Sequence, residues 1–270
     1  MAQWDRMDVD GSPMRLYVGM PSLGRAFPAV IVIHHGPGVE KFIEDRVENL
    51  ARQGYLAIAP DLYHRQTSAA AGVSSAAAGV SSAAAGVSSA AAAVSEDGDP
   101  LTRIGRLRDS EVINDVNAAV NYARRLKDTQ LGDVGIIGFC MGGRVAYLMA
   151  ASKPVFKAAA VFYGGDIMKA WGNGPTPFEL TPYIHCPILG FFGAEDANPS
   201  PADVDKIAAQ LDRYRKAYEF HRYPEAGHGF LNFTNPAVYR EGPGRDAWDK
   251  LLPFLQRNLL TSRQPRQRLT

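Results

Sequence analysis

The segment at residues 134–150 constrains the fold of this chain more than any other. It opens with Val-Gly-Ile-Ile at residues 134–137, a run of β-branched and small residues that predicts a short buried strand. A Gly-Phe-Cys-Met-Gly-Gly turn follows at residues 138–143, and a helical pattern begins directly after it. A strand, a tight glycine-flanked turn and a helix in this order predict a nucleophile elbow with Cys140 at its apex.

The glycines around Cys140 have a steric explanation in such an elbow. The nucleophile has a strained backbone conformation, and a Cβ on either side would collide with the strand or the helix. The helix N-terminus then points at the sulfur, where its N–H groups favour a thiolate and a later oxyanion. The alternative is an inert core thiol, because most free cysteines are buried and Gly-x-Cys-x-Gly also occurs by chance.

Apolar runs alternate with helical patterns along the rest of the chain. Residues 1–25 predict a hairpin at a sheet edge, with its turn at residues 11–13. Further strands are predicted at residues 29–34, 55–62, 158–163, 187–192 and 217–223, and helices at residues 42–53, 106–127, 201–214 and 248–260. This alternation predicts an α/β protein with a mostly parallel, doubly wound sheet, helices on both faces, and its chemistry at the carboxyl ends of the strands.

Residues 68–95 have a different character. The heptad Ala-Ala-Ala-Gly-Val-Ser-Ser occurs three times over residues 69–89, and a degenerate copy follows. Gly and Ser oppose a helix, and one Val per heptad gives no coiled-coil seam. We interpret the repeat as an expansion within a surface loop, and a lid or partner helix is the alternative. The chain is otherwise predicted to be a single domain over residues 1–270, with a flexible basic tail at 261–270.

Composition argues against several classes of protein. There are 29 basic and 28 acidic residues, which gives no indication of a nucleic-acid or membrane-surface partner. Two cysteines, Cys140 and Cys186, cannot build a disulfide scaffold. The N-terminus does not match a signal peptide, and no apolar run is long enough to cross a bilayer, so we expect a cytoplasmic protein that is a monomer or a small homo-oligomer. No cofactor is expected, nor a metal, because four of the histidines lack ligand spacing: His34, His64, His185 and His221.

Three loops that each follow a predicted strand carry candidate catalytic residues. Cys140 lies at the elbow, Asp196 follows the strand that ends at Phe192, and His228 follows the last strand. The chain order nucleophile, acid, histidine is that of α/β-hydrolases. A free thiol is mostly protonated at neutral pH, so His228 would take its proton while Asp196 fixes the imidazole tautomer and stabilises the imidazolium. Glu195 is the rival acid, and the plainer alternatives are a loop-capping Asp and a histidine that satisfies a turn.

The predicted oxyanion hole consists of two backbone N–H groups. One belongs to Met141, directly after the nucleophile. The other comes from the glycine-rich loop after the first buried strand, where Gly36 is the candidate.

Four motifs carry a resemblance to a known family. They are Gly-Phe-Cys-Met-Gly-Gly at residues 138–143, Ala-Pro-Asp-Leu-Tyr at 59–63, Phe-Gly-Ala-Glu-Asp at 192–196 and Gly-His-Gly-Phe at 227–230. Over about residues 29–260 the chain resembles the dienelactone hydrolase (carboxymethylenebutenolidase) family, which has the α/β-hydrolase fold. The resemblance implies that Cys140, Asp196 and His228 are nucleophile, acid and base. It also implies hydrolysis of a small lactone or enol ester through a thioester.

The chain departs from the family pattern at two positions. Members of the family carry a glutamate in the loop after the first buried strand that helps to ionise the cysteine, and that position falls on His35 or Gly36 here, with Glu40 and Glu44 further along. Asn232 stands where the family has an arginine for the substrate carboxylate. Candidate substrate-binding residues are His35, Arg103 and Tyr163, and Arg65 or Arg106 could supply the cation instead.

These departures leave two alternatives beside the dienelactone reaction. The first is a broad-specificity carboxylesterase or acyl-transfer enzyme. The second is a homologue that binds a ligand or senses redox state without turnover. In each catalytic case the expected partner is a small-molecule ester or lactone.

Overall fold

The computed structural model describes residues 2–22, 26–66, 99–126 and 130–259. The predicted loop insertion at residues 68–95 and the predicted tail at 261–270 lie outside the described residues, so both stay predictions.

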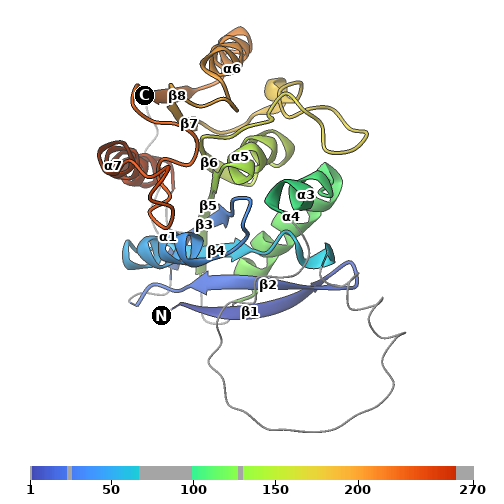
Figure 1. Ribbon diagram of the computed structural model, residues 1–270. Coiled ribbons are helices and arrows are strands. Elements are labelled where there is room, and N and C mark those ends of the chain that lie inside the picture. The colour runs from blue at the N-terminus through green and yellow to red at the C-terminus, as the bar shows by residue number, and fades with distance from the viewer. Residues whose placement is uncertain (1, 23–25, 67–98, 127–129, 260–270) are drawn as a thin grey trace, which may run out of the picture.

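Eight strands form one sheet in the order β1-β2-β4-β3-β5-β6-β7-β8 (Figure 1). β1 (Ala2–Val9) and β2 (Ser12–Gly19) make an antiparallel edge hairpin, and β2 pairs antiparallel with β4 (Leu56–Pro60). The other neighbours are parallel, which confirms the predicted mostly parallel sheet. The remaining strands are β3 (Ala26–Ile33), β5 (Gln130–Phe139), β6 (Phe156–Phe162), β7 (Ile188–Gly193) and β8 (Tyr218–Tyr223).

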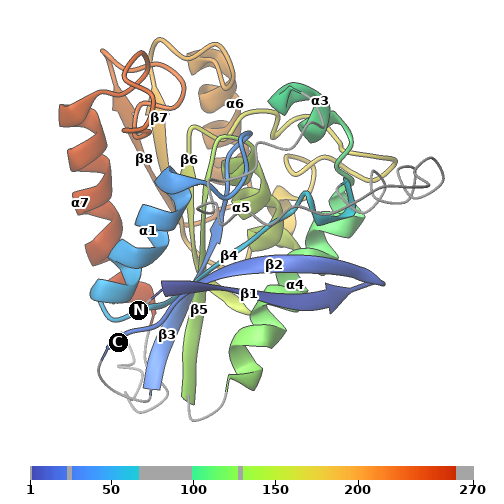
Figure 2. The same ribbon diagram turned by 60° about the horizontal axis from the view of Figure 1, so that its bottom comes forward.

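Helices cover both faces of this sheet (Figures 1 and 2). α1 (Lys41–Arg52) and α7 (Glu241–Asn258) pack on one face, and α4 (Asp109–Arg125), α5 (Met141–Ser152) and α6 (Pro201–Arg213) pack on the other. Two short helices, α3 (Pro100–Gly105) and the 3-10 turn η1 (Thr181–Tyr183), complete the described elements. No helix of the described residues is long and apolar enough to cross a membrane.

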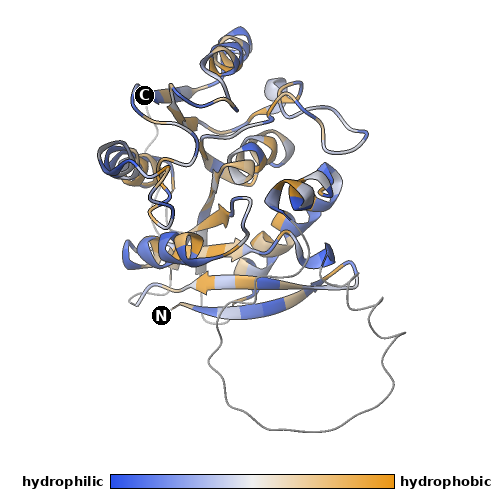
Figure 3. Cartoon of the chain, in the orientation of Figure 1, coloured by the Kyte–Doolittle hydropathy of each residue, from blue (hydrophilic) through white to orange (hydrophobic). Residues whose placement is uncertain are grey.

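The central strands are apolar throughout because both of their faces are buried. Successive side chains of a strand point to opposite faces. In β3, Val30 and Val32 therefore join the core under α1 and α7, while Ile31 and Ile33 join the core under α4, α5 and α6. Figure 3 shows hydrophobic colour on the inner strands, and burial of both faces explains the continuous apolar run at residues 29–34.

The prediction of one helix over residues 106–127 is wrong at the start of that helix. The chain forms α3, leaves helical geometry, and begins α4 at Asp109. Arg108 has extended backbone angles, φ −126° and ψ 133°. The tertiary contacts of the Asp109 carboxylate, which accepts hydrogen bonds from Arg144 and from the N–H of Trp171, explain why the helix begins there.

Two other boundaries also differ from prediction. The closing helix begins at Glu241 rather than at residue 248. The helix can include Pro243 because this proline lies in the first turn, where a backbone N–H has no intrahelical acceptor. The hairpin turn lies at Asp10 and Gly11, and Pro13 is part of β2, opposite Asp8.

A buried ion pair anchors the long connection between β6 and β7. Arg144 on α5 is fully buried and donates to both oxygens of Asp109 at 2.6 and 3.0 Å. Its Nε donates to the carbonyl of Asp166 at 3.1 Å, and its guanidinium lies 3.9 Å from the ring centre of Trp171. The connection is thereby fixed to the helix that carries the elbow.

Arg144→Met is expected to lower the free energy of unfolding by about 3–5 kcal/mol, because it leaves the Asp109 carboxylate buried without its cation. Urea denaturation measures the loss. Arg222→Met is the matched control, since its ion pair with Asp205 is exposed and should contribute under about 1 kcal/mol. Equal losses in the two variants would contradict the argument from burial.

Candidate active site

The register of the parallel strands brings the candidate loops to one edge of the sheet. Phe139 lies opposite Phe162, and Phe162 lies opposite Phe191. The N–H of Cys140 donates to the carbonyl of Phe162 at 3.0 Å, and the N–H of Tyr163 donates to that of Phe191 at 2.8 Å. Cys140, directly after β5, and Tyr163, directly after β6, therefore lie at the same level of the sheet edge, and β7 continues to Gly193 before the loop that carries Asp196.

The elbow has the strained geometry expected of a nucleophile turn. Cys140 has φ +57° and ψ −121°, a conformation that non-glycine residues rarely adopt, and α5 begins at the next residue. A Cβ at Gly138 would lie 1.9 Å from the carbonyl oxygen of Gly142, and one at Gly142 would lie 2.4 Å from that of Ile33. At Gly143 it would lie 2.8 Å from the Cα of Gly164. The expected steric need for glycine is confirmed at all three positions.

The structure brings Cys140, Asp196 and His228 together. His228 Nδ1 lies 2.9 Å from Asp196 Oδ2, and Cys140 is near enough to the imidazole to contribute to its raised pKa. The Asp196 side chain is only 2% exposed, whereas its rival Glu195 is exposed. Burial disfavours the imidazolium, but the hydrogen bonds with Asp196 and Cys140 and their negative charges outweigh burial and raise the pKa of His228 to about 10.

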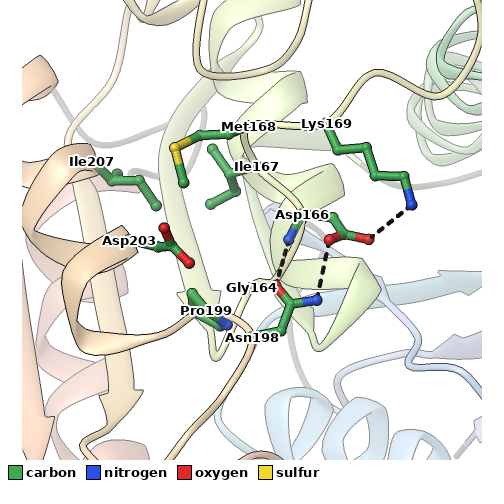
Figure 4. Close-up of a pocket in the computed structure, with 9 residues that line it drawn as sticks. All are labelled: Gly164, Asp166, Ile167, Met168, Lys169, Asn198, Pro199, Asp203 and Ile207. Atoms are coloured by element: carbon green, nitrogen blue, oxygen red, sulfur yellow. Dashed lines mark hydrogen bonds and ion pairs between the residues drawn. The ribbon is translucent and has the colours of Figure 1, made fainter.

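Asn198 ties the acid loop to the loop after β6. Its N–H donates to Asp196 Oδ1 at 2.8 Å. Its side chain accepts from the N–H of Asp166 and donates to Asp166 Oδ1, both at 3.1 Å (Figure 4). A cavity of about 160 Å³ lies here, lined by residues that include Met168 and Lys169 but neither Cys140 nor His228. The cavity is therefore beside the acid loop rather than over the cysteine.

The glycine-rich loop after β3 forms a tight turn. The N–H of Gly38 donates to the carbonyl of His35 at 3.0 Å, and Gly38 has φ +101°, which favours glycine. The Tyr63 hydroxyl donates to the carbonyl of Gly36 at 2.9 Å. Neither the N–H of Gly36 nor that of Met141 has an acceptor among the residues that the structure describes.

The candidate His35 is paired with a nearby carboxylate. Its Nε2 lies 2.7 Å from Glu40 Oε1, and the side chain of Glu40 also accepts the N–H of Phe42 at the start of α1. Burial opposes ionisation of Glu40, but these hydrogen bonds hold its pKa below the ordinary value. The pair brings a carboxylate into the loop where the family pattern has a glutamate.

Among the three candidate arginines, Arg103 is adjacent to the loop of residues 35–38 after β3, which carries the predicted oxyanion donor Gly36 and is called the oxyanion loop below. Its guanidinium lies 3.8 Å from the ring centre of Tyr63, and its Nη1 would be 4.0 Å from a Cβ at Gly38. Its Nε is buried without a hydrogen-bond partner among the described residues. Arg65 instead donates to both oxygens of Asp115 at 2.7 Å, and Arg106 is exposed.

Tyr163 lies beside the imidazole. Its backbone has φ +41°, its side chain is buried, and its ring centre is 5.3 Å from that of His228. Its hydroxyl has no partner within the described part of the chain. Asn232 instead has a local contact, because its carboxamide oxygen accepts the N–H of Thr234 in an exposed turn.

Sequence reasoning did not find Tyr63 or Asn198 as parts of the site. Tyr63 closes the Ala-Pro-Asp-Leu-Tyr motif at residues 59–63, so its position in that motif was a usable signal. No pattern in the sequence around Asn198 indicates that it hydrogen-bonds with both Asp196 and Asp166. Among the described residues no group of three His, Cys, Asp or Glu side chains could hold a metal ion.

Asp196→Asn is expected to lower the pKa of His228, because the imidazolium loses its buried carboxylate. The folded pKa of about 10 exceeds the ordinary 6.5, so protonation of His228 stabilises the fold fully below pH 6.5 and the effect is lost as the pH rises toward about 10. NMR titration of the imidazole and urea unfolding between pH 6 and 10 measure both effects. Glu195→Gln, at the exposed neighbour, should leave both profiles unchanged, and identical profiles for the two variants would refute the assignment of Asp196.

Comparison with known proteins places the chain in a family. The model of the dienelactone hydrolase family matches residues 14–259. A Synechocystis protein, provisionally named a carboxymethylenebutenolidase, is 34% identical over 244 residues, which cover 90% of this chain and 91% of that protein. A Methylorubrum extorquens protein with the same provisional name is 31% identical over 236 residues, 87% of this chain and 74% of that protein. A Klebsiella pneumoniae crystal structure, provisionally titled a dienelactone hydrolase, has a TM-score of 0.76 at 28% identity and covers 95% of this chain and 99% of its own. These matches confirm the resemblance: the chain belongs to the dienelactone hydrolase family and is a hydrolase of the lactone or ester type.

Proposed function

We propose that this enzyme hydrolyses a small lactone or enol ester through a thioester on Cys140. The observation that carries the proposal is the 2.9 Å contact of His228 with Asp196, beside a Cys140 that has the strained backbone of an elbow and contributes to the raised pKa of the same imidazole. A nucleophile, a base and a group that orients the base are the parts that acyl transfer requires.

The reaction has two stages. In the first, the sulfur of Cys140, whose proton is held by His228, adds to the substrate carbonyl, and the oxyanion accepts hydrogen bonds from the N–H groups of Met141 and Gly36. Collapse of this intermediate breaks the ester C–O bond, and the leaving oxygen takes the proton from His228. In the second stage His228 activates a water that hydrolyses the thioester and frees Cys140.

The raised pKa of His228 supports proton removal from the thiol without a glutamate at position 35. An imidazole whose conjugate acid is stabilised by a buried carboxylate is a stronger base than free histidine. The other thiol is unsuited to this role, because burial raises the pKa of Cys186 to about 12.

Arg103 supports a substrate that carries a carboxylate. Its guanidinium is adjacent to the oxyanion loop, and its buried Nε lacks a partner among the described residues. The second candidate function is a broad carboxylesterase, which the Asn232 side chain favours, since an amide offers no cation for a substrate carboxylate.

Cys140→Ala is expected to lower the rate of dienelactone hydrolysis by at least about 10³-fold, because covalent catalysis is lost. Cys140→Ser should keep a measurable rate with activated esters, since His228 can also serve a hydroxyl. Loss of substrate absorbance reports both. Cys186→Ala is the matched control and should turn over at the wild-type rate; unchanged turnover in Cys140→Ala would sink the proposal.

Arg103→Gln is expected to lower kcat/KM for dienelactone about 10-fold or more while neutral p-nitrophenyl esters react as before, because only the former presents a carboxylate. Arg106→Gln, at an exposed position nearby, serves as control. Similar kinetics of wild type and Arg103→Gln on the charged substrate, together with a preference for neutral esters, would favour the broad carboxylesterase.

A further inference from the structure

His34 is a fully buried histidine that the proposed reaction does not use. It is the first residue after β3, directly before the oxyanion loop. The N–H of Leu62 donates to its Nε2 at 3.2 Å. A backbone N–H can only donate, so Nε2 carries the lone pair and the proton of the neutral ring is on Nδ1.

The protonated nitrogen of His34 contacts the backbone of the oxyanion loop. Nδ1 lies 2.7 Å from the carbonyl oxygen of His35, so it donates to that oxygen. The same oxygen accepts the N–H of Gly38 at 3.0 Å. Burial lowers the pKa of His34 to about 4 against the opposing charge of Asp61, which agrees with the neutral ring that this contact pattern requires.

The contact with His35 determines the direction of the next N–H group. A trans peptide is planar, and its N–H points opposite to its C=O. Fixing the carbonyl of His35 therefore fixes the N–H of Gly36, which has no acceptor among the described residues. The following carbonyl, that of Gly36 itself, is held by the Tyr63 hydroxyl at 2.9 Å. Both peptide groups on either side of Gly36 are thus fixed by buried side chains.

We infer that His34, together with Tyr63, is a positioning residue that preforms the oxyanion hole by fixing the plane of the peptide between His35 and Gly36. The inference rests on the proposed function of Gly36. Neither side chain touches the substrate. Without the Nδ1 donor the His35 carbonyl keeps only the N–H of Gly38, so this peptide rotates more easily, and a rotated peptide presents its carbonyl, rather than its N–H, to a developing oxyanion.

A pair of substitutions separates the two contacts of the imidazole. In His34→Asn the amide nitrogen replaces the Nδ1 donor but not the Nε2 acceptor. In His34→Gln the side-chain oxygen replaces the Nε2 acceptor for Leu62 but leaves no donor at the δ position. The inference predicts nearly normal behaviour for the first variant and a defective oxyanion hole in the second, whereas a general packing role predicts similar defects in both.

The probe is trifluoroacetone, followed by ¹⁹F NMR. The sulfur of Cys140 adds to its carbonyl carbon, the carbonyl π electrons move to oxygen, and the thiol proton passes to His228, so the adduct carries an oxyanion without turnover. We expect His34→Gln to bind the ketone about 10- to 100-fold more weakly than wild type, a range below the full loss of one oxyanion donor, and His34→Asn to stay within about 3-fold. Alkylation of Cys140 by iodoacetamide, which forms no oxyanion, should be equally fast in all three proteins.

Four results would overturn the inference: unchanged ketone affinity in His34→Gln, equal losses in both variants, a parallel fall in alkylation, or a wild-type protein that forms no ketone adduct. If wild type forms the adduct but hydrolyses no ester, the proposed function fails while the comparison of variants still decides the role of His34. If thermal denaturation shows that His34→Gln is not folded, Tyr63→Phe replaces it in the test. This variant removes the hydroxyl that donates to the Gly36 carbonyl, and it must show the same selective loss of ketone binding.

Discussion

The close contact of the first turn of α5 with the ends of β3 and β5 is the constraint on which the site depends. A Cβ at Gly142 would lie 2.4 Å from the carbonyl oxygen of Ile33, and one at Gly138 would lie 1.9 Å from the oxygen of Gly142. Only glycine permits this approach, and it forces Cys140 to φ +57°. Because the oxyanion loop begins directly after Ile33, the same packing sets its distance from the N–H of Met141. Backbone contacts therefore place the nucleophile and both predicted oxyanion donors, and side chains only orient what the backbone has brought together.

Two buried carboxylates, Asp109 and Asp196, differ in role because one is paired with an arginine and the other with a histidine. Asp109 faces the guanidinium of Arg144, and this pair fixes the β6–β7 connection. Asp196 faces His228, which can gain and lose a proton. Its charge stabilises the imidazolium form of His228. The first pair thus ties two segments of the fold together, and the second is the pair whose proton count changes in the proposed reaction.

The fold and the three central residues could be predicted from sequence because their signals are local. A strand, a glycine-flanked turn and a helix around Cys140 identify the elbow, and Asp196 and His228 each lie just beyond an apolar strand. The start of α4 could not be predicted, since Asp109 is held by Arg144, 35 residues away in the chain. The contact of His35 with Glu40 depends on how tightly the loop turns, which Gly38 decides through a positive φ. Tyr63 reaches Gly36 across 27 residues, a pairing that only the register of β3 and β4 creates.

Tyr63 connects the candidate carboxylate site with the oxyanion loop. Its hydroxyl holds the Gly36 carbonyl, its ring centre lies 4.9 Å from that of His34, and the guanidinium of Arg103 lies 3.8 Å from its centre on a cation–π contact. In the proposed function, a substrate carboxylate on Arg103 would compete with the Tyr63 ring for the guanidinium charge. Binding at one end of the substrate would then act on the side chain that holds the loop of the proposed oxyanion donor at the other end. Binding energy from a remote group that improves the alignment of oxyanion donors raises kcat rather than lowering KM alone. Selectivity for acidic lactones in this enzyme would then arise in the chemical step, through a tyrosine that contacts neither reacting atom.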